Sequence, residues 1–283
     1  MILIDLNQVM IANLMMQLGN HKNAQVDENM LRHMILNTIR SYKMKFGAEY
    51  GEMIICADDK NYWRRKYFPY YKAARRKSRE ESELDWATIF QSLNKVREEL
   101  KEFFPYKVIQ IETAEADDII GVITHHEGQY LNTGKPILIL SSDKDYIQLH
   151  IYANVKQYDP ARKRWIKHAD PVRYLYEHIA KGDTGDGIPN ILSPDNAFVI
   201  GARQRPMTQK RLELFEDINN MSDEIKRNWK RNETLVDLKN VPDDLKEEIM
   251  KQYNKENDND RSHLFDYFIK NKLKNLMESI GEF

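Results

Sequence analysis

Three short apolar runs in this chain each lead to an aspartate. The runs are Met1–Ile4 before Asp5, Met53–Ala57 before Asp58, and Ile137–Leu140 shortly before Asp143. Short runs rich in isoleucine and leucine, with helix-length segments between them, predict buried parallel strands of an α/β sheet. Parallel strands direct their carboxyl ends to one edge of the sheet, where ligands bind. The three acids are therefore predicted to meet at that edge.

The remaining pattern sets the expected organisation. Helices are expected over about 27–45, 80–103 and 116–126, and further strands over 108–111 and 155–158. This alternation predicts a mostly parallel central sheet flanked by helices. From about Lys181 the pattern changes to helices and loops, including an amphipathic helix capped by Ser262 and extending to about Ile280. We predict an α/β domain over 1–180 and a smaller helical domain over 181–283.

Further acids lie near the predicted strand ends or in a glycine-rich turn: Glu115, Asp117, Asp118, Asp145, Asp183 and Asp186. Their spacing on a helix places Glu115 and Asp118 on one face, with Asp117 directed elsewhere. Taken singly, such acids are compatible with helix caps or turns. Caps do not require strand after strand of one sheet to end in an acid, and converging carboxylates repel one another unless cations hold them. The set therefore predicts a metal site.

The composition of this acid set indicates which metal is expected. The chain has eight histidines and one cysteine, without a zinc-binding spacing, so the ligands are hard oxygens. Oxygen ligands favour Mg²⁺, with Mn²⁺ as a substitute. Six or more carboxylates exceed what one octahedral ion uses, so two ions are expected. Two ions about 4 Å apart can stabilise the attacking and leaving oxygens of a phosphodiester displacement.

The segment 60–82 combines cations with aromatic rings. Nine lysines and arginines and no acid lie between Lys60 and Arg79, although the net charge of the chain is only −1. Cations bind phosphates and rings stack on bases, which predicts contact with single-stranded nucleic acid. The alternative is a solvated helix whose rings pack on the core. Pro69 interrupts such a helix, and the rings do not fall on one stripe.

Composition also limits the setting of the protein. No run approaches the roughly 20 apolar residues of a membrane span, so no membrane segment is expected. The first residues already belong to a predicted strand, so no signal peptide is expected either. Cys56 has no partner and is predicted to be a small core residue, which fits a reducing cytoplasm.

Four ordered motifs resemble those of the 5′-nuclease (flap endonuclease) superfamily. They are Asp5 after the first strand, Glu115–Gly121, Ser142–Leu149 and Gly182–Pro189. Within this superfamily the chain is most similar to the ribonucleases H of T-even-type bacteriophages. That similarity includes the strings Tyr62–Arg65, Arg79–Ser82, Asn154–Gln157 and Ile280–Phe283.

The resemblance implies a fold and an activity. The fold is a PIN-like 5′-nuclease core followed by a helical domain with a helix-turn-helix-type element that binds duplex. The activity is that of a metal-dependent 5′→3′ exonuclease and flap endonuclease on RNA–DNA and DNA duplexes, which removes RNA primers in lagging-strand replication with metal-activated water as the nucleophile. The implied metal-site acids are Asp5, Asp58, Glu115, Asp117, Asp118, Asp143, Asp145, Asp183 and Asp186, with Asp118 and Asp143 also catalytic.

The resemblance further implies how nucleic acid is held. Segment 60–82 is expected to arch over the 5′ strand, where Arg64, Lys72 and Arg75 match the arginine–lysine–arginine spacing of the superfamily. Arg64 and Lys72 would contact the scissile phosphate and stabilise charge in the transition state. Arg65 and Tyr71, in the same segment, are also predicted to bind nucleic acid.

The predicted helical domain departs from the superfamily in one segment. The superfamily usually has a glycine-rich hairpin that grips duplex backbone, but residues 190–203 contain Gly201 as their one glycine. Basic side chains just beyond it are predicted to grip the duplex instead: Arg203, Arg205, Lys210 and Arg211. The implied partners are forked or flapped DNA, RNA–DNA duplex, and the single-stranded-DNA-binding protein and sliding clamp of a replisome. The chain is expected to be a monomer in the host-cell cytoplasm.

Two other functions are compatible with parts of the pattern. A haloacid-dehalogenase-type phosphatase also places an aspartate after its first strand, but it needs a second acid where this chain has Asn7. A non-catalytic nucleic-acid-binding module would account for segment 60–82. It would not require so many converging acids.

Overall fold

The computed structural model describes residues 1–18, 27–82, 84–128 and 134–283. Its centre is a sheet with the strand order β3-β2-β1-β4-β5-β6. The strands are β1 (Ile2–Asp5), β2 (Met53–Ala57), β3 (Lys107–Gln110), β4 (Ile137–Leu140), β5 (Val155–Asp159) and β6 (Arg164–Ile166). Neighbouring strands are parallel except β5 and β6, which form an antiparallel edge pair. The predicted mostly parallel α/β sheet is confirmed.

The register of the central strands places the acids. β1 lies between β2 and β4, with Asp5 opposite Cys56 of β2 and Ile4 opposite Leu140 of β4. The chain runs from β1 outward in one direction to β2 and β3, and in the other to β4 and β5. Such a reversal of strand order opens a crevice at the carboxyl ends of the strands. Asp5, Asp58 and Asp143 all lie at this end.

One face of the sheet packs against helices from both ends of the chain. α1 (Leu6–Leu18), α2 (Glu28–Tyr50) and α5 (Trp86–Phe103) share a core with α11 (Leu264–Lys270) and α12 (Lys274–Met277). Asp27 and Asp85 begin α2 and α5 by accepting hydrogen bonds from the backbone N–H of Met30 and Thr88. Phe283, which directly follows the short helix η4 (Ile280–Glu282), is buried in the same core.

The opposite face is covered by a different set of elements. α6 (Ala116–Gly128), the 3₁₀ helices η1 (Asp145–Ile151) and η3 (Leu238–Asn240), and α10 (Asp243–Asn254) pack on it. Cys56 points into this core and is buried, as predicted. Gly121 lets α6 approach η3 closely, because a Cβ there would lie 2.9 Å from Cβ of Leu238.

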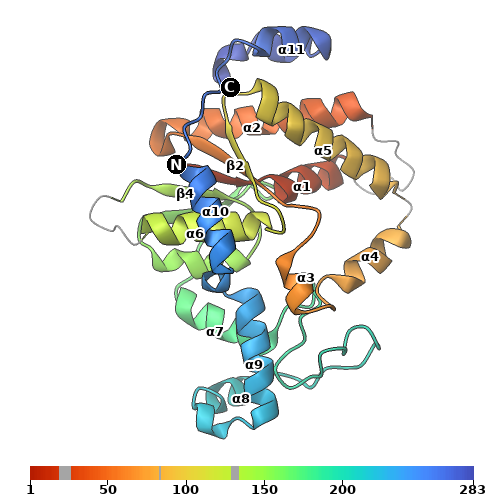
Figure 1. Ribbon diagram of the computed structural model, residues 1–283, viewed down its shortest axis with the longest axis vertical. Coiled ribbons are helices and arrows are strands. Elements are labelled where there is room, and N and C mark those ends of the chain that lie inside the picture. Colours follow the sequence, from red (N-terminus) through yellow and green to blue (C-terminus); the bar gives the residue numbers. More distant parts are fainter. Residues whose placement is uncertain (19–26, 83, 129–133) are drawn as a thin grey trace.

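A third group of elements extends beyond the carboxyl ends of the strands (Figure 1). It comprises α7 (Pro171–Lys181), α8 (Gln209–Leu214), η2 (Ile218–Asn220) and α9 (Asp223–Val236), with two small apolar cores, one of which also includes Phe68 and Tyr71 of segment 60–82. Figure 1 shows α8 and α9 at one end of the molecule and α11 at the other. The helices of the C-terminal third therefore lie at both ends of the molecule instead of forming one group. The division at residue 180 stays a prediction.

Segment 60–82 forms two short helices instead of one. α3 (Trp63–Tyr67) ends before Pro69, and α4 (Ala73–Glu80) follows after a turn. The expected helix over 80–103 is therefore wrong in its first residues, since α5 begins at Trp86. The expected helix from Ser262 to Ile280 is also interrupted, because Lys272 adopts a left-handed backbone (φ 55°) between α11 and α12, and Ser262 does not cap α11. Within the described ranges, no helix is both long and apolar enough to cross a membrane.

Candidate active site

A cavity of about 350 Å³ opens at the carboxyl ends of β1, β2 and β4. Its acidic lining residues are Asp5, Asp58, Glu115, Asp117 and Asp143. Its basic lining residues are Lys72, Arg75 and Arg79, all from the arch segment 60–82. The convergence predicted from the strand ends is thus present. Cations from the arch share the cavity with the acids.

Local hydrogen bonds hold the strand-end acids in place. Asp5 accepts from the backbone N–H of Gln8 at 3.1 Å and from the Ser141 hydroxyl at 3.2 Å. Asp58 accepts from the backbone N–H of Ala116 at 2.7 Å and from the side-chain amide of Asn7 at 2.8 Å. The residue that argued against a phosphatase therefore orients an acid of the cavity.

Asp117 faces the cavity, contrary to the prediction that it is directed elsewhere. The Tyr146 hydroxyl donates to its Oδ1 at 2.6 Å and lies 3.3 Å from Oδ2 of Asp5. The turn that begins α6 brings Glu115 and Asp117 to the same cavity, so spacing along a regular helix does not describe them. Asp118 instead lies behind the cavity wall and is fully buried.

Asp118 contacts a different set of partners. Its carboxylate accepts from the Trp63 indole N–H at 3.0 Å and from the backbone N–H of Glu115 at 2.9 Å, and it pairs with the Arg64 guanidinium at 2.7 Å. These contacts occupy the oxygens of the Asp118 carboxylate inside the protein. The structure does not place Asp118 among the acids that line the cavity.

Four lining acids, Asp5, Asp58, Asp117 and Asp143, are called the open acids below. Among the described residues, no lysine or arginine forms an ion pair with them. Burial, then repulsion from Asp58, raises the pKa of Asp5 to about 7. Burial also raises the pKa of Asp58, of Asp117 and of Asp143, with repulsion from neighbouring acids adding to it. The open acids are thus an oxygen-donor set that lacks positive charge, which suits a divalent cation.

Glu115, Asp118 and Asp186 are called the paired acids, because arch cations neutralise them. Lys72 contacts Glu115 at 2.5 Å and Asp186 at 3.5 Å, and Arg75 pairs with Asp186. Burial alone would raise the pKa of Glu115, but Lys72 and Arg64 outweigh it and the pKa is lowered. The Tyr71 hydroxyl lies 2.9 Å from a carboxylate oxygen of both Glu115 and Asp186.

The glycine-rich turn at 182–187 docks directly on the arch. The backbone N–H of Lys72 donates to the carbonyl of Asp186 at 2.7 Å, and Lys72 has a left-handed φ of 55°. Gly187 (φ 73°) permits this approach, since a Cβ there would lie 3.0 Å from the carbonyl oxygen of Tyr70. The turn therefore fixes the position of Lys72 at the cavity.

Two predicted nucleic-acid contacts are placed differently from the expectation. Arg64 is 3% exposed and bonds to Glu115, Asp118 and the carbonyl of Leu235, so it does not line the cavity. Tyr71 is 2% exposed, so its ring is not available to stack on a base. Arg64 was assigned by spacing and Tyr71 by its place in the arch, and neither criterion shows which side chains pack inward. Lys72 and Arg75 do line the cavity.

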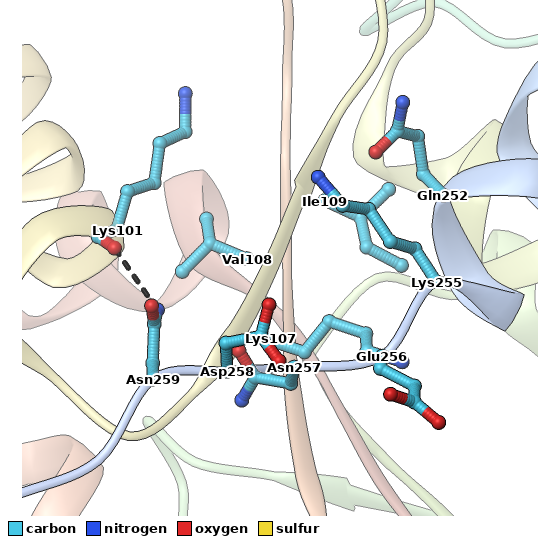
Figure 2. A pocket seen from close by; sticks show the side chains of 10 residues that line it. All are labelled: Lys101, Lys107, Val108, Ile109, Gln252, Lys255, Glu256, Asn257, Asp258 and Asn259. Atoms are coloured by element: carbon cyan, nitrogen blue, oxygen red, sulfur yellow. Dashed lines mark hydrogen bonds between the residues drawn. The ribbon is translucent and has the colours of Figure 1, made fainter.

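The remaining predicted basic residues lie apart from the cavity lining. Arg65, Arg203, Arg205 and Lys210 are exposed, while Arg211 is half-buried and donates to the carbonyl of Pro206 at 2.6 Å. Figure 2 shows another cavity, of about 210 Å³, between α5, β3 and the chain after α10. None of the predicted site residues lines it, and Asn259 closes one side by donating to the carbonyl of Lys101 at 3.0 Å.

Asp145 and Asp183 come together in a second cluster. His178 of α7 lies between them, with Nδ1 3.5 Å from Oδ1 of Asp145 and Nε2 3.4 Å from Oδ2 of Asp183. One ligand atom from each of the three residues lies within 4.8 Å of the others. The backbone N–H of Asp145 donates to Asp143 at 3.0 Å, which links this cluster to the open acids.

The sequence reasoning missed several residues of the two clusters. Asn7 and Tyr146 follow strand-end acids within a few residues, so proximity to such an acid was their signal. Arg79 lay in the basic run and lines the cavity beside Phe90. His178 gave no signal, because its partners Asp145 and Asp183 come from segments whose packing could not be predicted.

Comparison with known proteins identifies the family. The family described as 5′-3′ exonuclease, N-terminal resolvase-like domain matches residues 1–177, and the family described as T4 RNase H, C terminal, matches residues 172–283. The chain belongs to the 5′-3′ exonuclease family. It is 32% identical over 294 aligned residues to ribonuclease H of Enterobacteria phage T4, covering 99% of this chain and 95% of the relative.

Solved structures show the same fold. The D15 flap endonuclease of bacteriophage T5, in a pseudo-enzyme-product complex with DNA and metal ions, superposes with a TM-score of 0.61 at 18% identity. That match covers 90% of this chain and 99% of the T5 chain. The T5 5′-exonuclease with bound zinc also has a TM-score of 0.61 at 18% identity, covering 89% and 97% of the two chains.

The predicted enzyme class is confirmed by these relationships. The chain is a phosphodiester hydrolase of the 5′→3′ exonuclease family, and its partner class is nucleic acid. The phosphatase and the non-catalytic binding module are not favoured.

Proposed function

We propose that this nuclease uses two Mg²⁺ ions, replaceable by Mn²⁺, to cleave 5′ flaps and RNA–DNA or DNA duplexes, and that it removes RNA primers. We assign the first ion to the open acids, and the second to Asp143 and Asp145, on the side of Asp183. The observation that carries this proposal is the open-acid cavity: one buried carboxylate, Asp5, and three half-buried ones share about 350 Å³ with no ion-pair partner among the described residues. When bound, the ions would activate water and stabilise the leaving oxygen.

The charge distribution in the cavity supports a phosphodiester as substrate. Acids line its floor at the strand ends, and Lys72, Arg75 and Arg79 enter from the arch. A phosphate between these two layers would contact the bound metal ions on the side of the acids and the arch cations on the other side. Lys72 is held beside Glu115 and Asp186, so its ammonium is preorganised where negative charge develops in the transition state.

The side chains above the cavity suit the end of a single strand. The Tyr62 ring lines the cavity, lies 5.3 Å from the Lys72 ammonium and 5.0 Å from the Arg65 guanidinium. Arg79 lies 4.7 Å from the Phe90 ring, which also lines the cavity. Rings next to cations can stack a base while its phosphate is bound. Exposed Arg203, Arg205 and Lys210 are proposed to contact the duplex backbone.

The likeness to the phage T4 enzyme supports further proposals about context. We propose that the enzyme acts as a monomer on forked DNA in the host cytoplasm. The single-stranded-DNA-binding protein and the sliding clamp of the replisome are proposed partners.

A direct assay tests the proposed function. A 5′-labelled flap and an RNA-primed duplex are incubated with the enzyme, with Mg²⁺ and with chelator, and products are resolved by length. We expect cleavage of both substrates with Mg²⁺ and none with chelator. Cleavage in chelator would overturn the metal assignment. Cleavage of the flap but not of the RNA-primed strand would overturn primer removal alone.

A further inference from the structure

The cluster of Asp145, His178 and Asp183 contains a donor of a different chemical kind from the open acids. Its imidazole is 12% exposed and lies between two carboxylates that belong to separate segments. Asp145 begins η1, His178 lies in the last turn of α7, and Asp183 lies in the turn after α7. These elements pack closely, so the three side chains are held together by the fold.

The two ring nitrogens of His178 have different surroundings. Nε2 lies beside Asp183, which helps to orient the ring, and the Tyr174 ring packs edge-on at 5.8 Å between centroids. Nδ1 is buried and has no hydrogen-bond partner among the described residues. A proton on Nε2 directed at Asp183 leaves the Nδ1 lone pair free on the side of Asp145. Metal-bound histidines commonly donate their other ring N–H to a carboxylate in this way.

The spacing of the donor atoms also fits one ion. Two ligands about 2.1 Å from the same octahedral ion lie about 3 Å apart when adjacent and about 4 Å apart when opposite. The Nδ1 atom lies 3.5 Å from Oδ1 of Asp145, between these two values. Small side-chain adjustments suffice to bring these two atoms to one cation.

We propose that His178 Nδ1 is a direct ligand of the second cation, beside Asp145, and that Asp183 orients the ring. The two ion sites then differ chemically, because the open acids offer oxygen only. An imidazole ligand favours transition-metal ions such as Co²⁺ and Zn²⁺ over Mg²⁺. The second site should therefore select such ions more strongly than the first. This inference rests on the proposed two-ion function and deepens it.

Pulsed electron paramagnetic resonance of the enzyme loaded with Mn²⁺ alone tests the ligand directly. We expect a ¹⁴N coupling of a directly bound imidazole in the native enzyme, its loss in His178→Gln, and its retention in His168→Gln. His168 is a matched control, because it is exposed and also packs against Tyr174, 5.1 Å between ring centroids. Native enzyme that binds Mn²⁺ without this coupling would overturn the inference, even if His178→Gln failed to fold.

Calorimetry with Co²⁺ and Mg²⁺ tests the selectivity. Loss of one ligand in His178→Gln should weaken Co²⁺ binding at one site by about tenfold or more and Mg²⁺ binding by less than about threefold. Equal weakening of both ions, or stronger binding of both, would show that His178 acts only as a neighbouring group. Flap cleavage by the native enzyme with Mg²⁺ separates the two ideas: cleavage without a nitrogen ligand overturns this inference and leaves the proposed function intact.

Discussion

The open acids and the paired acids lie at the same edge of one sheet, yet they are stabilised in opposite ways. The paired acids are held by Arg64, Lys72 and Arg75, and the pKa of Glu115 is lowered mainly by Lys72 against the effect of burial. The open acids have hydrogen bonds but no such partner among the described residues, and burial raises their pKa values. Burial raises the pKa in both groups, so the difference in pKa between them comes from the ion pairs. The arch supplies cations to one wall of the cavity and leaves the other wall for metal.

Removing one open acid should have the largest effect. We expect Asp117→Asn and Asp143→Asn to lower the cleavage rate by about 1000-fold or more, because a metal ligand contributes several kcal/mol to the transition state. Flap binding should stay within about tenfold. The measurement is single-turnover cleavage alongside binding of the same labelled flap. Asp59→Asn is the control, since Asp59 also follows β2 but accepts from the backbone N–H of Thr113 at 3.0 Å and does not line the cavity. Full cleavage by either variant would disprove the ion assignment.

Removing one paired acid should chiefly affect stability. Asp118→Asn leaves the buried Arg64 guanidinium without its 2.7 Å partner, and breaking a buried pair costs about 3 kcal/mol. Urea unfolding of the metal-free protein measures this, with Asp117→Asn as the open-acid comparison. Asp118→Asn could instead unfold like the native protein and lose cleavage like Asp143→Asn. Asp118 would then be a metal ligand, and its assignment to the paired acids would be wrong.

Lys72 tests whether the cations of the paired wall act on the substrate. Lys72→Ala should lower turnover by about 100-fold and flap affinity by less, because a preorganised charge acts mainly where charge develops. Multiple-turnover kinetics on the 5′ flap measures the two effects separately. Lys66→Ala is the control, as Lys66 lies in the same arch and is exposed. An unchanged turnover number would assign Lys72 to structure alone.

The sequence was sufficient to predict that the acids at the strand ends meet at one edge of the sheet. It was not sufficient to predict which neighbouring side chains point into the protein instead of the cavity. Asp5, Asp58 and Asp143 were predicted to meet because parallel strands share one edge, and this geometry does not depend on side-chain packing. Asp117, Asp118 and Arg64 depend on how the start of α6 meets the arch. That contact involves Leu235, far along the chain, so local spacing could not define it. His178 meets its partners only through the packing of α7 on η1.

The smallest effect is expected in the metal-free protein, where an open acid destabilises the fold. The pKa of Asp5 is about 7 when folded, against an ordinary value of 3.8, because burial and repulsion from Asp58 oppose its charge. Between about pH 4 and 7 the folded state therefore holds a proton that the unfolded chain has lost, so stability falls as the pH rises through this range. This rise in pKa limits the loss of unfolding free energy caused by the Asp5 charge to about 4 kcal/mol. Because neighbouring acids share the proton, we expect a loss of about 2 kcal/mol.

Asp5→Asn removes that charge and should make the chelated protein about 2 kcal/mol more stable than the native protein at pH 8, and only about 1 kcal/mol more stable near pH 4.5. Urea unfolding with chelator at both values measures the difference. Asp118→Asn is the matched opposite, because it should be less stable than the native protein at pH 8. Added divalent ion should reverse the order for Asp5→Asn, since the ion stabilises only the native cavity with its full set of carboxylates. A variant at Asp5 that is less stable than the native protein at pH 8 without metal would mean that the open acids are neutralised inside the protein, and the distinction between the two walls would fail.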